Sequence, residues 1–159
     1  IPCLVDSLLQ LDFLLILRSP VEVVISLCKA EEISPYDALN LWIGSVFRAE
    51  CMSRPYSRNI FTYNQLLNKP QTILDSFGLN WNQSFMESRL DQATSFLRPS
   101  LYRTKVDNVR ESFVATNPEL TSLLALAEQI FDGFQHPTPD IARASEKLRY
   151  QWVEILADR

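Results

Sequence analysis

The sequence predicts an α/β domain that is rich in helix and has a helical C-terminal region. An almost continuously apolar run, Asp12 to Leu17, fits a strand buried on both faces, as in a parallel sheet. A second run, at 60–63, is β-branched and aromatic and lies about forty residues of helical pattern further on. Strands separated in this way pair in parallel through a right-handed crossover. We therefore expect parallel strands near 12–18 and 59–64.

Length, composition and charge limit the possible classes. The 159 residues are enough for one domain, and 47% hydrophobic with 21% charged residues is an ordinary globular composition. The net charge of −4 argues against a broad nucleic-acid surface, which needs a basic patch. The apolar start is interrupted by Asp6, Gln10 and Asp12 and has no basic leader, so neither a membrane span nor a secretory segment is expected.

The cysteines and the histidine predict no metal site and no disulfide framework. Cys3, Cys28 and Cys51 are odd in number and form no paired-cysteine motif. Reduced thiols are typical of cytoplasmic proteins, and we expect that location. The single histidine, His136, has no second histidine or carboxylate cluster beside it and is interpreted as a loop residue.

Helix signals follow the first predicted strand. Ser19-Pro20-Val21-Glu22 reads as a capping box with proline at the first helical position, so a helix is expected from Pro20 to about Glu32. Ser34-Pro35 begins the next helix. Its apolar stripe recurs at helical spacing and is interpreted as core; it comprises Leu39, Trp42, Ile43, Val46 and Phe47.

The second half of the chain predicts further helices and a three-part organisation. A helix beginning at Pro70 should close at Gly78, and another should follow from Ser84. We expect a core portion over 1–103, a polar linker without periodicity over 104–116, and a helical hairpin over 117–159. The two apolar stripes of this hairpin should pack on each other or on the main domain, as an antiparallel pair. A groove for a partner helix is the alternative.

The junction at Arg18 has the outline of a phosphate site. A strand, an abrupt turn and a helix aim backbone N–H groups and a positive dipole end at an anion, and Arg18 stands at that junction. Ser26 lies eight residues later, roughly 10 Å along the helix axis. A ligand that touches both residues must therefore lie along the helix flank. The alternative is that an ordinary α/β protein ends a strand in arginine and begins a helix with Ser-Pro.

The Arg-x-Pro segment with a serine eight positions after the arginine resembles the 3′-phosphate-binding segment of the sulfotransferases that use 3′-phosphoadenosine 5′-phosphosulfate. In that family the arginine and the serine hold the 3′-phosphate. The resemblance implies that Arg18 and Ser26 do so here. It also implies part of a P-loop-like three-layer sulfotransferase fold.

A second block is similar to the same family. Tyr63, two leucines and a proline-initiated helix that ends in Phe-Gly-Leu occur in the family's order, although Asn64 and Gln65 replace its acidic pair. The resemblance implies that Tyr63 lines the nucleotide side of the site. A Pro-Ser-Leu segment at 99–101 extends it to about residue 103 and makes Arg98 and Arg103 auxiliary candidates.

The resemblance implies sulfuryl transfer to a hydroxyl or amine acceptor, with 3′-phosphoadenosine 5′-phosphosulfate as co-substrate and no metal. The seventeen residues before Arg18 contain no lysine, histidine or glycine for the donor loop and base, so the catalytic residues are unknown and this chain alone is expected to be inactive.

Two strands cannot bury their own faces and edges, and the chain does not begin with methionine. We therefore expect an oligomer or the remainder of a longer chain. The alternative function is a non-catalytic helical interaction module. A kinase would need a Gly-x-x-x-x-Gly-Lys loop that the sequence lacks.

Overall fold

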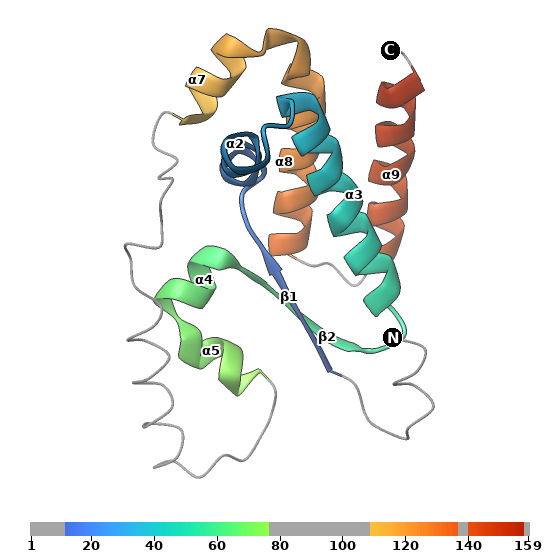
Figure 1. Cartoon of the computed structure of the whole chain (residues 1–159). Coiled ribbons are helices and arrows are strands. Elements are labelled where there is room, and N and C mark those ends of the chain that lie inside the picture. Colours follow the sequence, from blue (N-terminus) through green and yellow to red (C-terminus); the bar gives the residue numbers. More distant parts are fainter. Residues whose placement is uncertain (1–11, 77–108, 137–139, 158–159) are drawn as a thin grey trace.

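The computed structural model describes residues 12–76, 109–136 and 140–157 (Figure 1). In chain order the elements are β1 (Asp12–Leu17), α2 (Pro20–Glu31), α3 (Pro35–Ser53), β2 (Ser57–Thr62), α4 (Tyr63–Asn68), α5 (Pro70–Asp75), α7 (Val109–Thr116), a 3-10 turn (Pro118–Leu120), α8 (Thr121–Gln135) and α9 (Ile141–Ala157). The predictions for the helix from Ser84, the stop at Gly78, and Arg98 and Arg103 fall outside the described residues.

The two strands pair in parallel, as predicted. The prediction that the first strand is buried on both faces is wrong: within β1 only Leu17 is buried, and Leu14 is 38% exposed. Asp12 lies opposite Ser57 at one end of the pair and Leu17 lies opposite Thr62 at the other. The helices α2 and α3 form the crossover between the strands, so the described residues make a helix-rich α/β fold around a two-stranded parallel sheet.

The second strand ends before Tyr63, earlier than expected. Thr62 Oγ1 accepts a hydrogen bond from the Gln65 backbone N–H at 3.1 Å, and the Gln65 side chain accepts one from the Thr62 N–H at 2.7 Å. This is a reciprocal capping box. Tyr63 is consequently the first residue of α4 and not the last residue of a strand.

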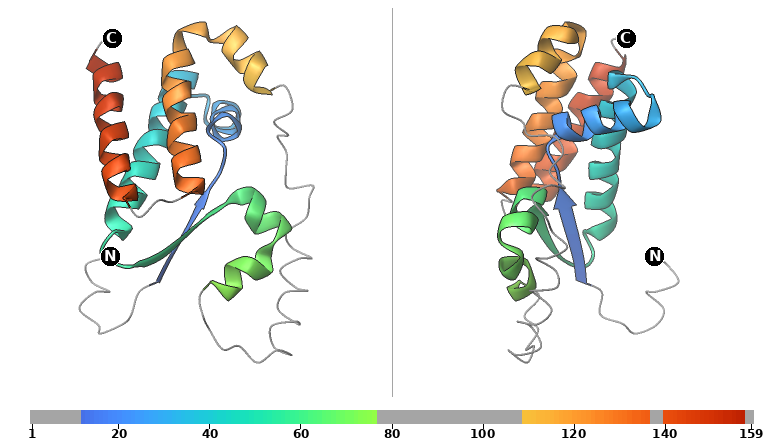
Figure 2. Two further views of the ribbon diagram at one scale, coloured as in Figure 1. Left: turned by 180° about the vertical axis from the view of Figure 1, so that it is seen from behind. Right: turned by 60° about the vertical axis from the view of Figure 1, so that its left-hand side comes forward.

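The helices share one apolar core. The stripe predicted for the second helix is buried on α3, where Leu39 and Ile43 are 0% exposed. Residues of α2, α3, α7 and α8 belong to the same cluster, and Leu148, Trp152 and Ile155 of α9 pack against it. The helices α8 and α9 run antiparallel and pack together, while α8 also packs on α2 and α3 (Figures 1 and 2). The prediction that these two helices pack on each other or on the main domain is confirmed.

The predicted linker over 104–116 is wrong for its second half. Residues 109–116 form α7, and Phe113 of this helix is only 7% exposed. Val109, Phe113 and Val114 all contact the common core. The polar residues between these three side chains lower the apparent periodicity, but the spacing of four from Val109 to Phe113 is that of one helix face.

Within the described residues, no helix is both long and apolar enough to cross a membrane.

A buried carboxylate joins three elements of the fold. Glu50 of α3 is 1% exposed, and it accepts hydrogen bonds from Arg54 Nη2 at 2.7 Å, Arg58 Nη1 at 3.2 Å and Ser145 Oγ at 3.1 Å. Arg58 lies on β2 and Ser145 lies on α9. Burial alone would raise the pKa of Glu50, but the hydrogen bonds and the charge of Arg54, together with Ser145 and Arg58, outweigh burial and hold the pKa below its usual value.

We predict that Glu50→Gln lowers the free energy of unfolding by about 3–5 kcal/mol near neutral pH, the cost of breaking a buried ion pair from one side. Since the folded-state pKa is lowered, the stabilisation is present above the unfolded-state value of about 4.3 and is lost as the pH falls through the folded-state value. Urea unfolding at several pH values checks this, because the difference in free energy of unfolding between wild type and variant should become smaller in acid.

The matched control is Glu146→Gln. Glu146 also pairs with Arg54, at 2.9 Å, but its side chain is 40% exposed. The expected cost of this change is about 0–1 kcal/mol. Equal losses in the two variants, or a difference from wild type that does not change with pH, would contradict a structural role for Glu50.

Candidate functional site

The parallel register brings Arg18 and Tyr63 to the same edge of the sheet. Leu17 and Thr62 are partners at the ends of their strands, so the next residue of each chain segment leaves the sheet at the same place. The Arg18 Cζ atom lies 5.1 Å from the centroid of the Tyr63 ring. This is a cation–π contact, which holds the guanidinium at the carboxyl edge of the two strands.

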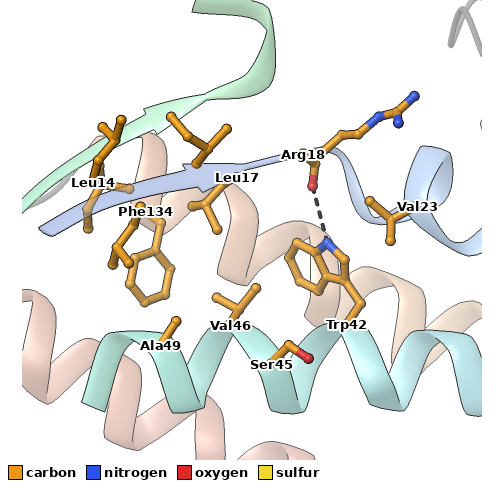
Figure 3. Close-up of a pocket in the computed structure, with 12 residues that line it drawn as sticks. Leu14, Leu17, Arg18, Val23, Trp42, Ser45, Val46, Ala49 and Phe134 are labelled. Atoms are coloured by element: carbon orange, nitrogen blue, oxygen red, sulfur yellow. Dashed lines mark hydrogen bonds between the residues drawn. The ribbon is translucent and has the colours of Figure 1, made fainter. Parts of the chain in front are cut away.

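The backbone of Arg18 is fixed from the other side by α3. Trp42 Nε1 donates a hydrogen bond to the Arg18 carbonyl oxygen at 3.2 Å (Figure 3). The Trp42 ring lies in the core at 6% exposure, whereas the Arg18 side chain extends away from it. The indole therefore fixes the turn between β1 and α2. The Arg18 guanidinium lies over the Tyr63 ring at the sheet edge.

The side chain of Glu22 pairs with Arg18 in place of capping the helix. Arg18 Nε donates to Glu22 Oε2 at 2.8 Å, and Glu22 is 1% exposed. The helix does begin at Pro20, but the Ser19 side chain makes no capping hydrogen bond, so the capping box predicted at Ser19 and Glu22 is wrong. The other carboxylate oxygen, Glu22 Oε1, is buried without a hydrogen-bond partner in the described structure.

A cavity of about 320 Å³ opens at this edge of the sheet. We call it the edge cavity. Four segments line it: the β1–α2 junction, the helix α2, the β2–α4 junction and the end of α8. The lining residues are Leu17, Arg18, Ser19, Glu22, Thr62, Tyr63, Asn64, Phe131 and Gln135. Its wall therefore combines a guanidinium, a carboxylate, an aromatic ring and the N-terminus of a helix, a set that can bind an anionic group attached to an aromatic one.

The sequence predicted part of this lining. Arg18 and Tyr63 come together as expected. Ser26 lies exposed on α2 and does not line the edge cavity. Arg98 and Arg103 lie outside the described residues. Glu22 was missed as a site residue although its position four residues after Arg18 is a signal for a pair on one helix face.

Phe131 and Gln135 of α8 were also missed. They lie more than a hundred residues after Arg18 in the sequence, yet both line the same cavity. Nothing in their local pattern distinguishes them from core and surface residues of an amphipathic helix. Only the packing of α8 on α2 places them at the edge cavity.

A second hollow, of about 350 Å³, lies between β1 and α3 (Figure 3). Apolar side chains dominate its lining, among them Leu14, Val46 and Phe134. Arg18 lines both hollows, but this one offers few other groups that could hold an anion or move a proton. We therefore assign the candidate chemistry to the edge cavity alone.

The described residues contain no group of three or more His, Cys, Asp or Glu side chains that could hold a metal ion.

Comparison of the chain with known protein families, with curated proteins and with solved structures found no match. The function of the edge cavity has to be argued from its own geometry.

We predict that Trp42→Phe lowers the free energy of unfolding by about 1–3 kcal/mol, because the Arg18 carbonyl loses its indole donor. The change should also weaken any ligand that binds at Arg18. Trp152→Phe is the matched control, since Trp152 Nε1 donates to Asn40 Oδ1 at 2.8 Å, away from the sheet edge. Chemical unfolding and titration of both variants check this. Equal loss of ligand affinity in the two variants would contradict the role assigned to Trp42.

Proposed function

We propose that this chain is a sulfotransferase-like module that binds the 3′-phosphate of 3′-phosphoadenosine 5′-phosphosulfate in the edge cavity. One observation carries the proposal: Arg18 stands where a parallel strand passes into a helix, directly beside Tyr63 at the end of the neighbouring strand. Ligands of open α/β sheets bind beyond the carboxyl ends of the strands, which is where these two residues meet. The P-loop-like three-layer fold belongs to the same proposal.

Arg18 is the phosphate ligand in this proposal. A guanidinium is a planar fork of N–H donors that matches the geometry of a phosphate, and its Nε donates to Glu22. Glu22 thereby orients the fork while Tyr63 supports it from one face. The N-terminus of α2 adds a positive dipole end beside Ser19, whose side chain does not cap the helix.

Tyr63 and Asn64 serve the nucleoside part of the ligand. The Tyr63 ring can stack on a purine, a contact that every base allows. Asn64 offers an amide where the sulfotransferases that this segment resembles carry an acidic residue, so it can form hydrogen bonds without adding negative charge. Ser26 lies one turn beyond Glu22 on α2 and would touch a phosphate that extends along the helix flank.

The transferred group would pass to a hydroxyl or amine acceptor, and the catalytic residues remain unassigned. Arg98 and Arg103 stay auxiliary candidates for the nucleotide. No metal is part of the proposal, because charge on the phosphates is balanced by arginine and by the helix N-terminus. A cytoplasmic location fits a nucleotide co-substrate and the unpaired cysteines Cys28 and Cys51.

We predict that Arg18→Ala weakens binding of adenosine 3′,5′-bisphosphate by at least about 2 kcal/mol, the scale of a charge-assisted hydrogen-bonded pair. Arg18→Lys should recover only part of the loss, because an ammonium cannot form the planar two-point contact. Isothermal titration calorimetry measures both variants. Arg48→Ala, which removes an exposed arginine from α3, is the matched control. If Arg18→Ala and Arg48→Ala both bind like wild type, the assignment of Arg18 is wrong.

The second candidate function is a helical interaction module, and one observation favours it. Tyr150, Val153 and Leu156 of α9 are 71%, 55% and 38% exposed, and their spacing of three places them along one side of the helix. Such a stripe is typical of a helix that meets another protein. A wild-type chain that shows no heat of binding with adenosine 3′,5′-bisphosphate would favour this function over the first.

A further inference from the structure

The strongest unexplained feature of the edge cavity is the second carboxylate oxygen of Glu22. The side chain is 1% exposed, and Oε2 is held by Arg18 Nε at 2.8 Å. Oε1 is buried and has no hydrogen-bond partner in the described structure. A buried carboxylate oxygen without a donor is costly, and native structures rarely keep one without a reason.

The hydrogen bonds of the cavity wall leave Glu22 Oε1 without a donor. The Thr62 hydroxyl lies 3.1 Å from Gln65 Oε1 in the capping box at the start of α4. The Asn64 side-chain oxygen accepts from Asn68 Nδ2 within α4. The Thr62 hydroxyl and the Asn64 side-chain oxygen are thus engaged at the start of α4, and Glu22 Oε1 is an acceptor that a ligand can satisfy.

The charge of Glu22 restricts what such a ligand can present to it. A phosphate oxygen beside the carboxylate would add like-charge repulsion, and an ether oxygen has no proton to give. The group that meets Glu22 must therefore carry an O–H or N–H. Arg18, the proposed phosphate ligand, contacts Glu22 Oε2 at 2.8 Å. A ligand group that donates to Glu22 Oε1 therefore belongs to the part of the ligand next to its phosphate.

We infer that Glu22 accepts a hydrogen bond from a hydroxyl group next to the bound phosphate, so that the edge cavity selects a ribonucleoside 3′-phosphate over its 2′-deoxy counterpart. The inference rests on the proposed function. In a 3′-phosphorylated nucleoside, the 2′-hydroxyl is on the carbon beside the one that carries the phosphate. One ligand then satisfies Arg18 with its phosphate and Glu22 Oε1 with the neighbouring hydroxyl.

The test compares adenosine 3′,5′-bisphosphate with 2′-deoxyadenosine 3′,5′-bisphosphate by isothermal titration calorimetry. Wild type should bind the ribonucleotide about tenfold or more tightly than the deoxynucleotide, the effect of one hydrogen bond to a charged group. Glu22→Gln keeps the shape and one acceptor oxygen, and it should reduce this ratio severalfold. Glu22→Ala should bring the ratio to about one.

Circular dichroism and urea unfolding show whether each variant is folded. If Glu22→Ala does not fold, the test uses Glu22→Gln alone. Glu31→Gln makes the same charge change at an exposed site on α2 and should keep the wild-type ratio. The inference is overturned if wild type binds the two nucleotides about equally, or if both Glu22 variants keep the wild-type preference for the ribonucleotide. In either case, binding of the ribonucleotide by wild type still supports the proposed function. Failure of wild type to bind either nucleotide overturns the proposed function, and the inference with it.

Discussion

The register of the two parallel strands is the constraint on which the candidate site depends. Leu17 faces Thr62, so the chain leaves both strands at the same level and Arg18 meets Tyr63. A shift of β1 by one residue would turn its side chains to the opposite face, and Leu17 would then leave the core. The burial of Leu17, at 8% exposure, and the Trp42 hydrogen bond to the Arg18 carbonyl both hold this register against such a shift.

Two buried glutamates show how the same residue type serves stability and a candidate site. Glu50 receives donors from Arg54, Arg58 and Ser145, and both of its carboxylate oxygens are satisfied. Such a group joins α3, β2 and α9 and has no capacity left for a ligand. Glu22 is equally buried but satisfied at one oxygen only. The Glu50 network lies near the start of β2, and Glu22 lies at the carboxyl ends of the two strands. The structural network and the candidate binding site are therefore at opposite ends of the sheet.

Local patterns in the sequence predicted the elements but not all of their contacts. The strand 12–17, the proline start of α2 and the buried stripe of α3 follow from apolar spacing and were found. The capping box at Ser19 failed because the Glu22 side chain pairs with Arg18, a competition that a motif does not reveal. The helix α7 was missed because its burial comes from contacts with distant helices. Phe131 and Gln135 reach the edge cavity only through tertiary packing.

The most direct test of the account is an NMR titration of the ¹⁵N-labelled chain with adenosine 3′,5′-bisphosphate. The account predicts that amide shifts change at residues 18, 19 and 21–23, where β1 passes into α2, and at 62–64, where β2 passes into α4. Adenosine 5′-monophosphate, which lacks the 3′-phosphate, should leave the amides at 18, 19 and 21–23 largely unchanged. No shift at either junction, or shifts confined to α8 and α9, would contradict a nucleotide site at the carboxyl edge of the two strands.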